Sequence, residues 1–160
     1  MTTKFAAGSP KGSFDAVIGM SFSIKVDGGR EIAAIKEVSG LKLEVDVIEL
    51  KQQNAAGHYV NTKILGRPKS GTITLTRVMT EDDCFEKWMQ DTYDMVPGRQ
   101  VPRADAVITV YDVMMKPIKK FTVHDAQPSS LEITQMQAGG TAALEEKLTL
   151  QHVGIKVEKG

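Results

Sequence analysis

The sequence predicts a mainly β fold, an antiparallel sandwich or barrel that carries a single α-helix. Most of the chain alternates apolar and polar residues with a period of two, which is the pattern of strands buried on one face. One stretch, over residues 81–93, instead spaces its apolar residues by three and four, as an amphipathic helix does. Because strands follow one another without intervening helices, the pattern argues against a parallel sheet.

Length and composition fit one domain that buries a core. The chain has 160 residues, of which 41% are hydrophobic and 25% are charged, and these values are close to those of globular proteins. Residues 1–13 are rich in glycine, serine, proline and lysine and show little periodicity, so we expect a flexible N-terminal arm. Residues 14–160 then form the predicted single β-domain.

The charge balance narrows the classes of partner. Lys and Arg together number 20, as do Asp and Glu, which argues against a protein that binds mainly through phosphates or anionic lipids. The apolar stretches are short, and the first residues lack the apolar region of a signal peptide. We therefore expect a protein that is made and kept in the cytoplasm, with no membrane anchoring.

The first predicted strand runs from Met20 to Val26 and ends at the turn residues 27–29. Residues 32–38 form the returning strand, which Ser39 and Gly40 interrupt. A further strand alternates Leu41, Leu43, Val45 and Val47 with Lys42, Glu44 and Asp46. Its phase slips at Ile48, which predicts a bulge or a strand that passes into another environment.

The segment from Glu49 to Val60 is polar and too long for a tight hairpin turn. Residues 52–57 form its flexible tip, and an extended pattern resumes at Tyr59.

The clearest strand of the chain follows the loop 66–71. Ile73 and Leu75 face one side of this strand, and Thr72, Thr74 and Thr76 face the other. The helix over 81–93 comes next, with Thr80 as its expected N-cap and residues 97 and 98 as its stop. Further strands are expected over 106–112, 118–126, 131–136 and 144–153. The residues expected in the core are Ile73, Leu75, Phe85, Trp88, Leu148 and Leu150.

Catalytic and metal-binding motifs are weak. The three histidines, His58, His124 and His152, lack the spacing of metal ligands. Cys84 is the single cysteine, so no internal disulfide is predicted, and a small buried side chain is its expected role. Lys69-Ser70 leads into a strand and not a helix, so it does not form a phosphate-binding loop. We expect no enzyme, no metal and no cofactor; a hydrolase would need His124, Asp125 or Cys84 to converge in a cleft.

Three sets of polar residues lie opposite the apolar faces of their strands. They are Thr72, Thr74 and Thr76; Lys42, Glu44 and Asp46; and Lys147, Thr149 and Gln151. These polar faces are uncharged or balanced in charge. Alternation alone does not assign them a function, because the hydrated outer wall of any barrel shows the same pattern.

Several short motifs occur in a characteristic order. They are Phe22 to Gly29, Glu37-Val-Ser-Gly-Leu41, Leu65 to Lys69 leading into Gly71 to Arg77, and the ending Leu148 to Gly154. In this order, and with the helix around Trp88 between them, the sequence resembles the tail tube protein family over residues 14–155. That family includes tube proteins of contractile phage tails and inner tube proteins of phage-tail-like contractile injection systems. The chain departs from the family's pattern at residues 49–57 and 65–68.

The resemblance implies a structural subunit that forms hexameric rings, in which the sheets of neighbours join into one continuous barrel. The rings stack into a hollow tube inside a contractile sheath, as a conduit for DNA or effector protein. The implied partners are further copies of the chain, the sheath protein, baseplate and tube-terminating proteins, and the cargo. The implied location is a virion or phage-tail-like particle assembled in the bacterial cytoplasm.

The resemblance also assigns surfaces to the ring. The polar sets are expected to face the lumen: Thr72, Thr74, Thr76, Lys147, Thr149, Gln151, Lys42, Glu44 and Asp46. The loop of residues 49–60, expected to be poorly ordered in an isolated subunit, is expected to contact an adjacent ring through Glu49, Lys51, Gln52, Gln53, Asn54, His58 and Tyr59. A monomeric ligand-binding β-barrel is the alternative, and it would require an internal apolar pocket.

Overall fold

The computed structural model describes residues 21–26, 30–94, 98 and 103–160. The expected arm over 1–13 and the turn at 27–29 lie outside these residues. All strand pairs in the described part are antiparallel, and its one α-helix is α1 (Cys84–Tyr93). The predicted fold class is therefore confirmed.

The first sheet collects strands from both ends of the chain. Its order is β2 (Arg30–Ile32), β1 (Ser21–Val26), β7 (Ala104–Tyr111), the first half of β8 (Pro117–Ile133) and β10 (Gly154–Lys159). The second sheet has the order β3 (Ile35–Ser39), β6 (Gly71–Val78), β9 (Glu145–His152) and the second half of β8.

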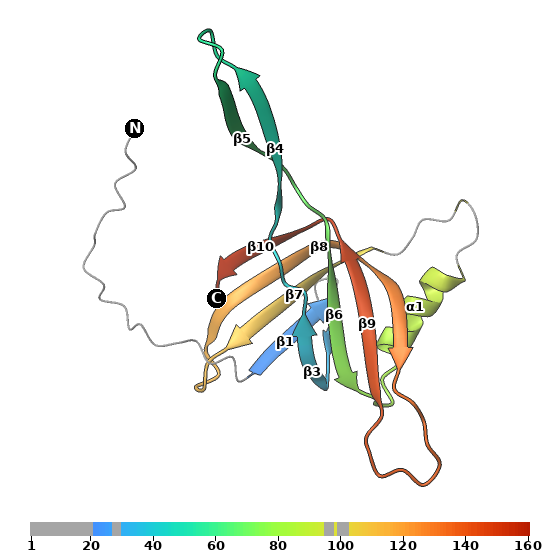
Figure 1. Cartoon of the computed structure of the whole chain (residues 1–160). Helices are drawn as coiled ribbons and strands as arrows, with labels where there is room; N and C mark the ends of the chain where they lie inside the picture. Colours follow the sequence, from blue (N-terminus) through green and yellow to red (C-terminus); the bar gives the residue numbers. More distant parts are fainter. Residues whose placement is uncertain (1–20, 27–29, 95–97, 99–102) are drawn as a thin grey trace.

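Strand β8 belongs to both sheets. Its residues 119–124 pair with β10, and its residues 127–133 pair with β9. Between these two parts Asp125 takes a positive φ of 51°. Val153, the residue between β9 and β10, lies beside this point and donates its amide hydrogen bond to the His124 carbonyl. β8 and the neighbouring segment β9–β10 thus change sheets at the same place, and the two sheets of Figure 1 are continuous through them.

The core lies between the two sheets and α1. It contains Ile24, Ile108 and Val123 from the first sheet, Ile73, Leu75, Leu148 and Leu150 from the second, and Phe85 from the helix. Five of the six residues expected in the core are at most 1% exposed. Trp88 is the exception, because it is only partly buried and packs against the outside of this cluster.

The helix begins later than its sequence pattern predicts. The N-cap is Asp83, without a side-chain capping bond, and not Thr80. The Thr80 hydroxyl instead accepts a hydrogen bond from the Asp82 amide at 3.3 Å, and the Asp82 carboxylate accepts one from the Cys84 amide at 3.3 Å. Residues 80–83 therefore form a turn that joins β6 to α1.

The predicted returning strand over 32–38 is two strands. Ala34 has a φ of 61°, so β2 ends before it and pairs with β1, whereas β3 begins after it and pairs with β6. The chain therefore passes from the first sheet to the second at Ala34.

Strands β4 (Val45–Gln53) and β5 (Tyr59–Pro68) form a separate two-stranded ribbon that projects from the body (Figure 1). The strand expected from Leu41 therefore starts only at Val45, and a register irregularity follows between Val45 and Val47. Most of the expected loop 49–60 is paired strand, with a short tip at residues 54–58. The phase slip at Ile48 has a simple cause, since this strand has left the core.

Candidate functional site

A continuous polar face covers one side of the second sheet. The register pairs Thr72 with Gln151, Thr74 with Thr149 and Thr76 with Lys147. Directly paired residues of antiparallel strands share a face, so the structure brings all six of these predicted residues together. The Thr72 hydroxyl also donates a hydrogen bond to Gln151 Oε1 at 3.0 Å.

The same face extends to both neighbouring strands. Glu37 and Ser39 of β3 lie opposite Thr76 and Thr74. On the other side, β8 contributes Gln127, Ser130 and Glu132 opposite Gln151, Thr149 and Lys147. Sequence reasoning missed these residues because alternation identifies the faces of a strand but not its partners.

Four of the predicted lumen residues do not fit this exposed face. Thr76 lies on it by register but is only 7% exposed, between cross-strand partners, Glu37 and Lys147, that have longer side chains. Lys42 and Glu44 precede β4 and form an ion pair with each other at 2.8 Å. Asp46 lies on the ribbon and pairs with Lys69 at 3.4 Å. These last three residues lie at the root of the ribbon because the chain leaves the body before they can join the sheet.

The ribbon has an apolar face that sequence reasoning missed. The register pairs Ile48 with Ile64, Leu50 with Thr62, and Gln52 with Val60. The apolar members are 38–50% exposed: Ile48, Leu50, Val60 and Ile64. Because the ribbon lies apart from the core, these aliphatic side chains are open to solvent in the single chain.

The opposite face of the ribbon is polar along its middle, with the exposed apolar pair Val47 and Leu65 near its root. Glu49 and Lys63 form an ion pair at 3.6 Å on this face. The other predicted stacking residues divide between the faces and the tip: Lys51, Gln53 and Tyr59 lie on the polar face, Gln52 lies on the apolar face, and Asn54 and His58 form the tip. The Asn54 carboxamide oxygen accepts hydrogen bonds from the amides of Ala56 and His58 and so closes the tip.

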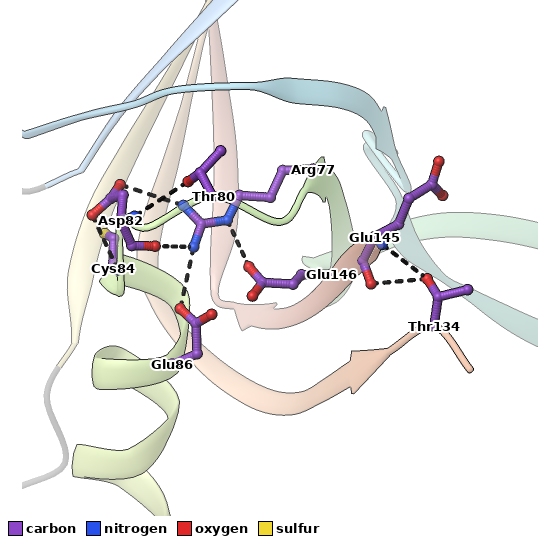
Figure 2. A network of polar contacts seen from close by, with 8 residues as sticks. All are labelled: Arg77, Thr80, Asp82, Cys84, Glu86, Thr134, Glu145 and Glu146. Carbon is purple, nitrogen blue, oxygen red and sulfur yellow. Dashed lines mark hydrogen bonds and ion pairs between the residues drawn. The ribbon is translucent and has the colours of Figure 1, made fainter. Parts of the chain in front are cut away.

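A buried polar network attaches α1 to the second sheet (Figure 2). Arg77 of β6 donates from Nε to Glu146 of β9 at 2.8 Å, and both side chains are inaccessible to solvent. Its other nitrogens contact the Asp82 carboxylate at 3.3 Å, the Asp82 carbonyl at 2.6 Å and Glu86 at 3.2 Å. The guanidinium also lies 4.2 Å from the ring centroid of Phe85.

A signal for this network exists in the sequence. Arg77 continues the core phase of Ile73 and Leu75, and Glu146 continues that of Leu148 and Leu150. Two opposite charges in the core phase of neighbouring strands indicate a buried pair. Burial, with a hydrogen bond to Glu86, raises the pKa of the Glu146 carboxyl, while Arg77 acts in the opposite direction.

The residues considered for catalysis do not converge. Cys84 is buried in the core, whereas His124 is exposed and pairs with Asp105 at 3.4 Å. The hollow that His124 lines includes neither Asp125 nor Cys84. In the part of the chain that the structure describes, no group of three or more His, Cys, Asp or Glu side chains is arranged to hold a metal ion.

Two hollows formed by described residues lie on the surface. One of about 650 Å³ is lined by residues 134–144, a connection outside the core.

Over residues 21–26, 30–94, 98 and 103–160, no helix has sufficient length and hydropathy to span a membrane.

Residues 19–156 match the family model of the T4-like virus tail tube protein gp19. The chain belongs to this family. Membership identifies a structural subunit of a tail tube, which confirms the resemblance inferred from the ordered motifs. No curated protein sequence matches this tail tube protein significantly.

Solved structures share its fold. A chain of an extracellular contractile injection system, the PVC sheath-tube complex in the extended state, matches with a TM-score of 0.74 and 20% identity, over 92% of this chain and 94% of that one. A chain of the PVC sheath/tube terminator matches with a TM-score of 0.74 and 20% identity, over 92% and 99%. A chain of the anti-feeding prophage tube-terminating cap matches with a TM-score of 0.71 and 18% identity, over 87% and 88%.

Proposed function

We propose that this tail tube protein forms hexameric rings that stack into the hollow inner tube of a contractile injection system or contractile tail. The family match over residues 19–156 carries the proposal. The role is mechanical, because the tube is driven through a target envelope and guides cargo through its bore. It requires no catalytic chemistry in the subunit.

Ring closure would use the two free edges of the second sheet. Among the described residues, β3 pairs only with β6, and residues 127–133 of β8 pair only with β9. Exposed strand edges tend to pair with other chains, and cyclic closure satisfies them. Joining β3 of one copy to β8 of the next would extend the second sheets into one barrel around a bore.

The polar face of the second sheet would line this bore, because the first sheet and α1 cover its other side. Thr72, Thr74, Thr149 and Gln151 offer hydroxyl and amide groups, and Lys147 lies directly opposite Glu132. A wall without a strong net charge allows DNA or effector protein to pass, whereas a strongly basic wall would retain a polyanion.

Ring stacking would use the ribbon of β4 and β5. Its apolar face would bury Ile48, Leu50, Val60 and Ile64 against a copy in the adjacent ring, since these side chains are exposed in the single chain. The polar face and the tip would contribute the predicted polar contacts: Glu49, Lys51, Gln52, Gln53, Asn54, His58 and Tyr59.

The remaining partners follow from the structural relatives. The PVC chain comes from a sheath-tube complex, and other similar chains come from a tube-terminating cap and a baseplate. We extend these partners to this chain: a contractile sheath, a baseplate and a tube-terminating protein. The place of action is a virion or phage-tail-like particle.

The test is negative-stain electron microscopy of the purified protein and of two matched variants. The Ile48→Thr/Ile64→Thr variant changes a facing pair on the apolar face, and the Glu49→Thr/Lys63→Thr variant changes the adjacent pair on the polar face. We expect rings and tubes from the wild type, no tubes from the apolar variant, and tubes from the control. Deleting 51–58 should likewise leave the fold intact and block tube growth.

Two results would contradict the proposal. A wild-type protein that stays monomeric at high concentration, and that binds a small apolar ligand, would favour the ligand-binding barrel. Normal tubes from the Ile48→Thr/Ile64→Thr variant would remove the apolar face from the stacking contact.

A further inference from the structure

A surface hollow of about 450 Å³ lies where the ribbon joins the body. One wall consists of residues 42–44 and 67–69, where the ribbon begins and ends. The other wall consists of His124 and residues 152–155, where β8 bends and β9 gives way to β10. The lining residues are Lys42, Leu43, Glu44, Arg67, Pro68, Lys69, His124, His152, Val153, Gly154 and Ile155.

The hollow is basic. Its lining contains three cationic side chains and one carboxylate, a formal excess of two positive charges with histidine neutral. Lys42 pairs with Glu44, and Lys69 pairs with Asp46. Arg67 has no ion-pair partner within the described part of the chain, so its planar guanidinium is available for a carboxylate.

His152 adds unused hydrogen-bonding capacity to this lining. The residue is only 4% exposed, and neither Nδ1 nor Nε2 has a hydrogen-bond partner among the described residues. Burial lowers the pKa of the imidazole, so the ring is neutral at pH 7 and offers one donor and one acceptor. A buried polar group without a partner is costly, which distinguishes this wall of the hollow from an ordinary surface.

Gly71 fixes the position of this imidazole. It is the direct cross-strand partner of His152, and a Cβ at position 71 would lie 2.9 Å from His152 Nε2. Only glycine therefore leaves room for the ring in this place. The site is thus built by the strand pairing and does not depend on a flexible surface side chain.

We propose that this hollow receives an acidic side chain from a second copy of the chain, with its carboxylate paired to Arg67 beside the buried His152 imidazole. The inference rests on the proposed tube assembly and assigns to it one specific contact. The bound side chain would supply the ion-pair partner that the Arg67 guanidinium lacks.

A second copy is the favoured occupant because the chain carries a complementary surface. Residues 81–94 contain six acidic residues and one lysine, and Glu81, Asp91 and Asp94 are exposed. This acidic stretch follows the Val78 end of β6, whereas the hollow lies at the Gly71 end, roughly 23 Å away at about 3.3 Å per residue. A head-to-tail contact between copies brings unlike ends together.

Zero-length cross-linking tests the contact directly. Tubes are assembled from equal amounts of unlabelled and ¹⁵N-labelled protein, treated with a water-soluble carbodiimide, and digested for mass spectrometry. The Arg67→Lys variant is treated in parallel, because it keeps the charge and places a reactive amine in the hollow. We expect pairs of mixed isotope composition that join position 67 or Lys69 to an acidic residue of another copy.

Charge reversal supplies the second readout. Arg67→Glu should raise the protein concentration needed for assembly about tenfold or more, as expected for a lost charge pair at an interface. Lys119→Glu, at an exposed position outside the hollow, should leave that concentration unchanged. His152→Asn should weaken assembly with an unchanged circular dichroism spectrum.

The failures of the two proposals are distinguishable. Tubes that yield only same-isotope cross-links from the hollow, or unchanged assembly of Arg67→Glu, would overturn the inference and leave the tube function intact. Normal tubes of Arg67→Glu that no longer retain a short DNA would assign the hollow to phosphate and also overturn it. Absence of wild-type rings and tubes would refute the proposed function itself.

Discussion

Arg77 and Glu146 face each other across β6 and β9, at positions where both strands otherwise direct aliphatic side chains into the core. Their 2.8 Å contact is fully shielded from solvent. Because Arg77 also reaches Asp82 and Glu86, one guanidinium joins two strands to the start of the helix.

Removing Arg77 should destabilise the isolated subunit strongly. Arg77→Met leaves the Glu146 carboxylate buried without its partner, and breaking such a pair costs about 3–5 kcal/mol. Urea unfolding followed by circular dichroism measures the loss. Lys36→Met is the control, because it breaks the exposed ion pair with Glu145 and should cost far less. If the two variants lost equal unfolding free energy, the buried Arg77 network would contribute no more to stability than an exposed ion pair.

Raising the pH should weaken the contribution of Glu146 to stability. Burial is the main cause of its raised pKa, so the folded chain holds this proton more tightly than the unfolded chain does. Such a contribution is complete below the unfolded pKa and is lost as pH rises through the folded pKa.

The comparison of wild type with Glu146→Gln isolates this effect. The difference in unfolding free energy between them should become less favourable to the wild type as the pH rises above 4.5, the ordinary pKa of a glutamate. Urea titrations at several pH values measure it. A difference that grows with pH would show that pairing of the ionised carboxylate with Arg77 dominates.

Gly40 should tolerate no side chain. It has a φ of 84°, and a Cβ there would lie 2.3 Å from the Thr72 carbonyl oxygen. Gly40→Ala should therefore cost about 3 kcal/mol or more. Gly139→Ala is the matched control, since Gly139 has a φ of 77° in open space and should cost only about 1 kcal/mol. Equal losses of thermal stability in the two variants would contradict the close approach of Gly40 to the Thr72 carbonyl oxygen.

Phe85 should matter more to stability than Trp88. Phe85 is 0% exposed, and truncating a buried aromatic to alanine costs about 3–5 kcal/mol. Trp88 is only partly buried, so Trp88→Ala should cost about 2 kcal/mol. Denaturant midpoints of Phe85→Ala and Trp88→Ala test the order. A larger loss for Trp88→Ala would show that its indole packs more completely than its exposure indicates.

Thr74 should be reachable only through the bore of an assembled tube. Thr74→Cys in a Cys84→Ser background provides one reactive thiol on the polar face. A small maleimide should label closed tubes, and a maleimide too bulky for the bore should not, whereas both should label unassembled subunits. Equal labelling of closed tubes by the two reagents would place Thr74 on the outer surface.

Alternation predicted the faces of the strands because one side of each is buried. The pattern places Ile73, Leu75, Leu148 and Leu150 in the core, and the register places their polar neighbours on one surface. The pattern could not reveal the split at Ala34 or the passage of β8 through both sheets, since both depend on which distant strand lies alongside.

The ribbon and the hollow were harder to predict for different physical reasons. Ile48 and Leu50 interrupt the alternation because the ribbon has no core of its own, so their apolar character points to a surface that a single chain does not cover. Arg67 and His152 are far apart in the sequence, and only the bend beside Val153 brings them to the same hollow.

The passage of β8 through both sheets has a mechanical consequence. A force along this strand acts on its backbone hydrogen bonds in shear, so many of them bear the load at once and they do not open one by one. The covalent chain also continues across the bend at Asp125, so one layer cannot slide over the other without distorting that backbone. A force applied to one sheet is therefore transmitted through β8 to the other.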